Sequence, residues 1–187
     1  MTELNVLLIS GALRKGSYNR KLLTEAATLF EGTATIADLN LPLYDGDLED
    51  AHGIPEGVQT LYDQIANANA VVISTPEYNK SFSGVLKNAL DWVSRAEGNP
   101  WREKPVAIVS AADGRSGGER AQYALRLAMN PFRAMVLPGP EVAVAGAKNE
   151  FDEAGKLTNE RYLKNLGFLM KRLHREAVAH HATRTSA

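Results

Sequence analysis

Three loops of small, polar and charged residues follow apolar runs of the sequence, and each has the residue types of a binding loop. The first spans residues 10–19 (SGALRKGSYN) and enters a helical pattern at Ser17, a residue type that caps helix N-termini. The backbone N–H groups and the positive dipole end at the start of a helix bind anions. Ser17 and Asn19 add neutral donors, and Arg14 and Lys15 add positive charge. The loop therefore indicates a phosphate site, although an ordinary turn with a capping serine has the same pattern.

The glycine spacing of this loop narrows the kind of phosphate ligand. Gly11 and Gly16 are spaced as in a nucleotide-triphosphate P-loop, but that motif needs a lysine directly after the second glycine, where Ser17 stands. The apolar run at residues 70–75 also ends without the aspartate that would hold Mg²⁺, and the loop does not fit the dinucleotide pattern G-x-G-x-x-G. A single terminal phosphate is the ligand that remains.

The second loop spans residues 75–84 (TPEYNKSFSG), where Pro76 ends the preceding apolar run. An extended loop of this kind can lay backbone amides along the edge of a planar ring, with Tyr78 and Phe82 as aromatic walls. The alternative is a solvent-exposed connection in which Tyr78 covers the end of a sheet.

The third loop, residues 110–118 (SAADGRSGG), contains a G-x-S-x-G pattern centred on Ser116, which matches the nucleophile elbow of serine hydrolases. A catalytic triad needs a later acid and then a histidine. The later histidines, at positions 174, 180 and 181, fall on the last helical pattern or the tail, and Ser116 does not follow its strand directly. A hydrolase using Ser116 therefore stays as an alternative that is weaker than a flexible glycine-rich turn.

No metal site is indicated by the remaining chemistry-bearing residues. The four histidines are scattered, and the carboxylates between Asp45 and Asp50 fall in a long loop expected over residues 40–55. We interpret these carboxylates as a solvated acidic rim.

The composition is that of one globular domain. Because the chain has no cysteine, any redox chemistry would have to be carried by an organic cofactor. The chain has 187 residues, against about 150 per domain, and its 21 basic and 22 acidic residues leave a net charge of −1. That balance argues against a nucleic-acid binder. The absence of cysteine excludes disulfides, thiolate nucleophiles and cysteine-ligated clusters. The N-terminal stretch lacks a signal-peptide pattern and no apolar run reaches the ~18 residues of a membrane span, so we expect a cytoplasmic protein without a membrane partner.

Strand and helix patterns alternate along the chain. Strands are expected at residues 4–9, 33–39, 70–75 and 105–111, with a last strand around 136 and 142–145, and helices at 18–30, 58–68, 84–95, 120–129 and 159–178. This alternation predicts a flavodoxin-like, doubly wound α/β fold, with a five-stranded parallel sheet and helices on both faces. We expect one domain over residues 1–179 and a disordered tail over 180–187. The three loops then meet at the carboxyl edge of the sheet, where such folds bind ligands.

Two runs of the sequence and the glycine-rich third loop resemble a known family. The runs are GALRKGSYN (11–19) and the long, specific block PEYNKSFSGVLKNALDWVSR (76–95). They are similar to the NAD(P)H-dependent FMN reductases, in particular the branch that contains bacterial chromate and quinone reductases and azobenzene reductases. The similarity extends from about Leu4 to the last helical pattern.

The resemblance implies an FMN site built from the three loops. The FMN phosphate and ribityl chain would lie on the first loop, the isoalloxazine ring on the second, and the third would close the other side. The implied residues are, loop by loop, Ser10, Leu13, Arg14, Ser17 and Asn19; Pro76, Glu77, Tyr78 and Asn79; and Ser110 and Gly114. The sequence departs from the family pattern where Ala12 replaces a serine, Lys80 an aromatic residue and Ser83 a proline.

The resemblance also implies the activity: NADPH or NADH passes hydride to bound FMN, and two electrons then go to a quinone, an azo compound, a metal oxyanion or free flavin. The flavin carries the chemistry, so we assign no catalytic residue. A flavodoxin-type electron carrier and the hydrolase stay open as alternatives. The family commonly forms homo-oligomers, so a homodimer or homotetramer is expected. The helix at 84–95 would present Trp92 beside Asn88 and Asp91 at a two-fold interface, or Trp92 would pack on the sheet.

Overall fold

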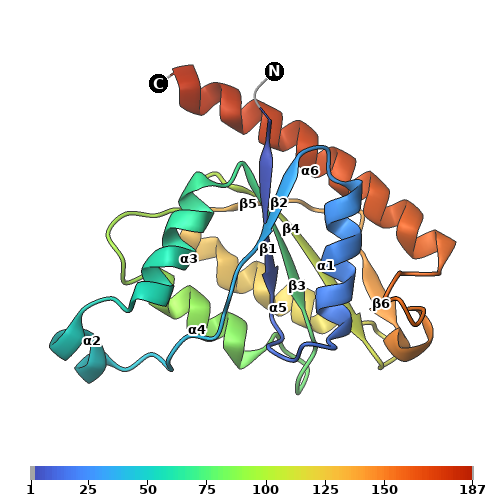
Figure 1. The fold of residues 1–187 in the computed structure, drawn as a ribbon, viewed down its shortest axis with the longest axis horizontal. Coiled ribbons are helices and arrows are strands. Elements are labelled where there is room, and N and C mark those ends of the chain that lie inside the picture. The colour runs from blue at the N-terminus through green and yellow to red at the C-terminus, as the bar shows by residue number, and fades with distance from the viewer. Residues whose placement is uncertain (1–2, 187) are drawn as a thin grey trace.

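A twisted parallel sheet forms the centre of the computed structural model, which describes residues 3–186 (Figure 1). The strand order is β2-β1-β3-β4-β5, and β6 also pairs with β4. Because helices cover both faces, β1 and β3 are buried along almost their whole length, which explains their unbroken apolar runs. The strands are β1 (Asn5–Ser10), β2 (Thr33–Ile36), β3 (Ala70–Thr75), β4 (Pro105–Ala112), β5 (Met135–Val136) and β6 (Ala143–Ala145).

The fifth position of the sheet is shared by two short strands. Residue Val136 of β5 pairs with Val106 near the start of β4, and Ala143 of β6 pairs with Ser110 near its end. The segment between them contains Pro138 and Pro140, and proline has no N–H to donate to a strand ladder. The sequence predicted one last strand flanking this turn, and the structure has two.

Two layers of helices cover the sheet and bury alternate residues of each strand. Val6 and Leu8 of β1 belong to the apolar cluster beneath α1 (Tyr18–Leu29) and α6 (Glu160–Ser186). Leu7 and Ile9 belong to the cluster on the other face, beneath α3 (Glu56–Asn67), α4 (Gly84–Val93) and α5 (Glu119–Met129). This alternation follows from the two-residue period of a strand. The predicted doubly wound, flavodoxin-like architecture is confirmed.

One helix was missed by sequence reasoning. The expected loop over residues 40–55 contains α2 (Gly46–His52), whose N-cap Asp45 accepts a hydrogen bond from the backbone N of Asp47 at 3.0 Å. None of its residues is buried, so it has no apolar stripe that periodicity could detect.

The last helix is longer than expected. Residues 180–186 continue α6 as helix, where the sequence analysis expects a disordered tail; residue 187 lies outside the described residues. The helix is held by packing of Ala177, which is fully buried, and by a 3.2 Å contact between Nδ2 of Asn69 and Nδ1 of His181. Within the described residues, no helix combines the length and the apolar character that crossing a bilayer requires.

Candidate functional site

A cavity of about 220 Å³ lies at the carboxyl edge of the sheet, where the loops after β1, β3 and β4 meet. The chain order reverses at this point, because β1 has β2 on one side and β3 on the other. Such a switch point is the usual ligand site of an open α/β sheet. The cavity is lined by Ala12, Arg14, Ser17, Tyr18, Asn19, Pro76, Glu77, Tyr78, Ala111, Ala112 and Asp113.

Six of the eleven predicted site residues line this carboxyl-edge cavity, and five do not. The six are Arg14, Ser17, Asn19, Pro76, Glu77 and Tyr78. The others, Ser10, Leu13, Asn79, Ser110 and Gly114, lie on the same three loops but outside the lining. Of the five other lining residues, Ala12 had been named only as a departure from the family pattern, and sequence reasoning missed Tyr18, Ala111, Ala112 and Asp113. Their positions could have indicated this role, because they directly follow Ser17 or lie at the carboxyl end of β4.

The first loop places hydrogen-bond donors and a positive charge at the start of α1. Ser17 is the N-cap, and its Oγ accepts a hydrogen bond from the backbone N of Asn19 at 3.2 Å. The hydroxyl hydrogen of Ser17 and the first-turn N–H groups of α1 are the kind of donors that bind a phosphate. Arg14, on the exposed side of the loop, adds positive charge beside them.

Asn19 is buried and fastens the first loop to two strands. Its Oδ1 accepts hydrogen bonds from Oγ of Ser74 at 2.8 Å and from the backbone N of Ala111 at 3.0 Å. Its Nδ2 donates to the carbonyl oxygen of Ala111 at 2.9 Å. Most donor and acceptor positions of this side chain are therefore occupied within the protein. The side chain fixes where α1 begins relative to β3 and β4.

Two other predicted residues, Ser10 and Ser110, also hold the loops in place from within the protein. The Oγ of Ser10 donates to the carbonyl oxygen of Ala12 at 3.1 Å and shapes the turn after β1. The Oγ of Ser110 donates to the carbonyl oxygen of Gly117 at 2.7 Å and accepts from Nε2 of Gln122 at 2.8 Å. Both serines are buried, so they position the first and third loops.

The second loop ends in a tight hairpin beside the cavity. The backbone N–H and C=O of Tyr78 pair with those of Ser81 at 3.0 and 3.1 Å, and the two residues between, Asn79 and Lys80, have φ values of 51° and 65°. Two left-handed residues in a row are the signature of a type I′ turn. A lysine in this conformation is strained, and residues held in this way gather at functional sites. The turn leaves Tyr78 58% exposed at the mouth of the cavity.

Glu77 presents a buried acceptor on the cavity wall. Its Oε1 accepts a 3.4 Å hydrogen bond from Nη1 of Arg120, whereas Oε2 is buried and has no partner among the described residues. A buried, unsatisfied acceptor costs about 1–3 kcal/mol, more when it is charged, so a donor that reached Oε2 would be favourable. The pyrimidine edge of an isoalloxazine ring carries such an N–H. The residues around the cavity thus include donors suited to a phosphate and a carboxylate suited to a ring N–H, and this donor and acceptor set matches the chemistry of FMN.

The geometry does not assemble a hydrolase triad around Ser116. No histidine lines the carboxyl-edge cavity. His181 contacts Asn69, which precedes β3 at the amino edge of the sheet, and the His174 ring packs on Phe30. Ser116 follows the carboxyl end of β4, at the opposite edge. No group of three histidine or carboxylate side chains able to hold a metal ion occurs within residues 3–186.

The helix after the second loop holds the segment that precedes α2. Nε1 of Trp92 and Nδ2 of Asn88 both donate to the carbonyl oxygen of Pro42, at 2.8 and 2.9 Å, and Oδ1 of Asn88 accepts from the backbone N of Tyr44 at 2.8 Å. Trp92 is fully buried, so the expectation that it anchors a subunit interface is wrong; it packs inside the chain. The clamp leaves Leu43, between its two attachment points, 80% exposed.

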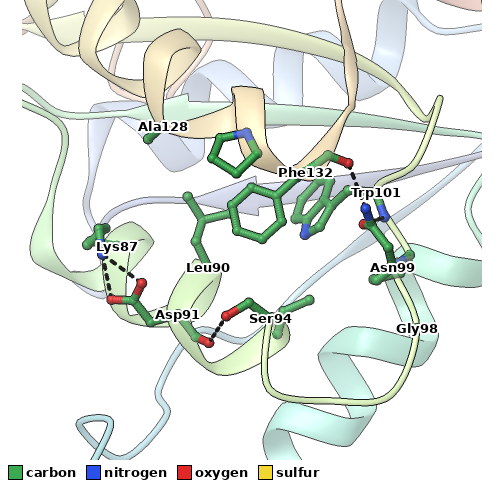
Figure 2. A pocket seen from close by; sticks show the side chains of 12 residues that line it. Lys87, Leu90, Asp91, Ser94, Gly98, Asn99, Trp101, Ala128 and Phe132 are labelled. Carbon is green, nitrogen blue, oxygen red and sulfur yellow. Dashed lines mark hydrogen bonds and ion pairs between the residues drawn. The ribbon is translucent and has the colours of Figure 1, made fainter.

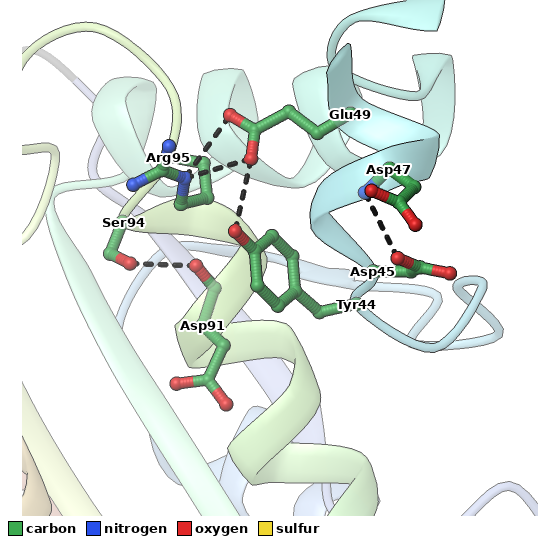
Figure 3. A network of polar contacts seen from close by, with 7 residues as sticks. All are labelled: Tyr44, Asp45, Asp47, Glu49, Asp91, Ser94 and Arg95. Carbon is green, nitrogen blue, oxygen red and sulfur yellow. Dashed lines mark hydrogen bonds and ion pairs between the residues drawn. The ribbon is translucent and has the colours of Figure 1, made fainter. Parts of the chain in front are cut away.

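An ion-pair network ties α2 to the end of α4 (Figure 3). Nε of Arg95 donates to both carboxylate oxygens of Glu49, at 2.9 and 3.1 Å, and the hydroxyl of Tyr44 donates to Oε2 at 3.1 Å. The hydrogen bond from Arg95 lowers the pKa of Glu49, and the hydrogen bond to Glu49 raises the pKa of Tyr44. Asp45 caps α2 and Glu49 pairs with Arg95. Two of the carboxylates interpreted as a solvated acidic rim therefore have partners within the chain.

The sequence and the fold match one group of known proteins. A family model described as NADPH-dependent FMN reductase matches residues 4–149, which include all three loops. The NAD(P)H-dependent FMN reductase PA1204 of Pseudomonas aeruginosa is 44% identical over 162 residues, covering 85% of this chain and 87% of that protein. A quinone reductase of Escherichia coli K12 is 40% identical over 169 residues, covering 88% and 90%. The solved structure of FerB, a flavoenzyme NAD(P)H:(acceptor) oxidoreductase from Paracoccus denitrificans, has a TM-score of 0.84 at 31% identity, covering 96% of this chain and 99% of that one.

Proposed function

The chain belongs to the NADPH-dependent FMN reductase family, and from this premise we propose that FMN lies in the carboxyl-edge cavity, with its phosphate at the start of α1 and its ring along the second loop. The observation that carries the placement is that one cavity joins the N-terminus of α1 to Glu77, whose Oε2 has no partner among the described residues. The protein is an NAD(P)H-dependent flavin oxidoreductase.

The side chains at the site bind and orient, while FMN, when bound, supplies hydride acceptance and donation. Ser17, Arg14 and the first turn of α1 hold the phosphate. Ser10, Asn19 and Ser110 hold the loops in place. Pro76 to Asn79 provide the platform for the ring, with Glu77 accepting a hydrogen bond at its edge. Leu13 and Gly114 flank this platform on the first and third loops. No side chain is required as a nucleophile or base.

We propose a quinone as the electron acceptor, because a relative at 40% identity is named quinone reductase. Tyr78 and Leu13 are exposed on loops of the site and would give a planar apolar acceptor a surface to pack on. An open site of this kind is also expected to reduce azo compounds, free flavin and metal oxyanions such as chromate. NADPH and NADH are intracellular co-substrates, so the activity belongs in the cytoplasm.

A homodimer or homotetramer is the proposed working unit. The support is a set of large apolar side chains on the described surface, above all Leu43 and Leu127, which are 80% and 71% exposed. Exposed apolar residues of this size mark association surfaces when they gather in patches. A neighbouring subunit would also shield a flavin that lies on an open sheet edge.

The test is purification of the protein followed by a spectrum and an activity assay. We expect flavin absorbance that persists through gel filtration, FMN as the released chromophore, and NADPH oxidation that depends on added 1,4-benzoquinone. Protein that stays colourless in excess FMN and oxidises no NADPH or NADH would overturn the proposal.

A further inference from the structure

A second and larger cavity, of about 510 Å³, lies at the amino edge of the sheet, opposite the carboxyl-edge cavity. Figure 2 shows it from close by. It is formed by the second half of α4, the end of α5 with the turn after it, and residues 98–101 before β4. Because β4 runs eight residues from this amino edge to the carboxyl edge, the two cavities are separated by roughly 25 Å. A volume of this size holds a small organic molecule.

The walls of this amino-edge pocket are apolar and aromatic. Leu90 and Ala128 line it from two helices, and Phe132 and Trp101 meet edge to face with ring centroids 6.4 Å apart. The charged residues at its rim neutralise each other, since Nζ of Lys87 donates to both carboxylate oxygens of Asp91 at 2.6 and 2.8 Å. The pocket therefore suits a neutral molecule.

One polar group in the wall lacks its hydrogen bond. The indole of Trp101 is 2% exposed, and its Nε1 has no acceptor among the residues that the structure describes. Buried indole N–H groups usually find a partner, as Nε1 of Trp92 does in the carbonyl oxygen of Pro42 at 2.8 Å. Figure 2 shows the nitrogen edge of the Trp101 ring turned toward the wall that carries Ser94. The nitrogen itself is buried, so an acceptor atom meets it only when the side chains of this wall shift as a ligand enters the pocket.

We propose that the amino-edge pocket binds neutral aromatic carbonyl compounds, with the ring against Phe132 and the carbonyl oxygen accepting a hydrogen bond from Nε1 of Trp101. The apolar walls select the ring, the paired rim disfavours a charged ligand, and the single buried donor selects the oxygen. The site is distinct from the proposed flavin site, so its ligand is bound and not reduced there. The proposal does not depend on the reaction carried out at the carboxyl edge.

The experiment uses acetophenone and ethylbenzene, two probes that differ by the carbonyl oxygen. The holoenzyme, labelled with ¹⁵N, gives two indole N–H signals, because the chain has two tryptophans, and Trp101→Phe assigns them. Acetophenone is expected to move the Trp101 signal downfield and saturably, leaving the Trp92 signal in place. It should bind about three- to tenfold more tightly than ethylbenzene, the range expected of one hydrogen bond.

Two variants make the result decisive. Trp101→Phe keeps the aromatic wall and should abolish the preference for acetophenone. Ala128→Phe fills the pocket from α5 and should weaken both probes, with the flavin spectrum and both indole signals retained. Equal affinity for the two probes, a Trp101 signal that does not move, or undiminished binding in Ala128→Phe would each overturn the proposal. If a second copy of the chain covers the pocket, acetophenone cannot enter it and the Trp101 signal does not move.

Discussion

Polar side chains around the carboxyl-edge cavity divide into those that face it and those that hold its loops. Ser17 and Glu77 line the cavity with a donor and an acceptor, whereas Asn19, although it also borders the cavity, and Ser110 are buried and hydrogen-bonded within the chain. Residue type alone does not separate the two groups, because a serine or asparagine next to a ligand and one beneath it look alike in sequence. The separation depends on which strand each side chain reaches.

This division makes Ser17 and Asn19 respond differently to substitution. Ser17→Ala removes a cap and a phosphate donor, so FMN affinity should fall roughly 10- to 100-fold while the free energy of unfolding drops by about 1 kcal/mol. Asn19→Ala leaves Ser74 and Ala111 without partners and should cost about 2–3 kcal/mol of unfolding free energy. Flavin fluorescence titration and urea denaturation of the flavin-free protein measure the two quantities. Equal losses of stability in both variants would contradict the assignment.

Glu77 offers a test of charge beside the ring. Glu77→Gln keeps an acceptor oxygen and removes the negative charge, which otherwise disfavours an electron-rich flavin nearby. The reduction potential of bound FMN should therefore become more positive, as measured by spectroscopic titration against a reference dye. The control is Glu119→Gln, an exposed carboxylate at the start of α5. A potential that stays at the wild-type value would show that Glu77 does not face the ring.

At the scale of elements, α4 links the flavin loop to the segment around α2. The helix begins at Gly84, directly after the second loop, and its side chains Asn88 and Trp92 hold the backbone on either side of Leu43. The sequence predicted α4 as a helix correctly, since the apolar spacing was strong. It did not reveal the clamp, because a tryptophan at helical spacing gives no sign of the distant carbonyl that it will meet.

The network between Glu49 and Arg95 predicts a pH dependence of stability. Arg95 lowers the pKa of Glu49 from its ordinary value of 4.5, so the folded state binds this proton less readily than the unfolded chain. Such a carboxylate stabilises the fold above the unfolded pKa, and the contribution is lost as the pH falls through the folded pKa. The difference in unfolding free energy between wild type and Glu49→Gln should thus be constant near neutrality and vanish in acid.

Urea denaturation of both proteins across this range measures the difference. Asp50→Asn, one residue along α2, is the control for net charge. A gap between wild type and Glu49→Gln that persists or widens in acid would rule out the ion pair as its source.

At the scale of the whole molecule, the parallel sheet and the two helical layers were predictable from the alternation of apolar runs with helical stripes. Because crossover connections between parallel strands are right-handed, few arrangements of the elements are possible for such an alternation. The length of α6 and the split of the fifth strand were not predictable. They depend on long-range partners, Asn69 in one case and the two separate ends of β4 in the other.

Association of subunits is the prediction that belongs to this scale. The wild-type protein should sediment well above the 20.3 kDa of one chain, and Leu43→Glu should shift it to a smaller species by placing a charge in an apolar contact. Asn40→Glu adds the same charge to a nearby exposed site and should leave the mass unchanged. A fully active wild-type protein that sediments as a single chain at micromolar concentration would refute the proposed oligomer.

The split fifth strand bears on how the protein avoids aggregation. An uninterrupted outer strand offers a row of free N–H and C=O groups on which another molecule can add a strand. Here the prolines of residues 137–142 remove donors from that row, and two arginines take up acceptors: Arg126 donates to the carbonyl oxygen of Leu137 at 2.7 Å and Arg172 to that of Gly139 at 3.2 Å. Between β5 and β6 the edge thus offers few free groups on which another strand could add, and replacing the prolines should increase their number.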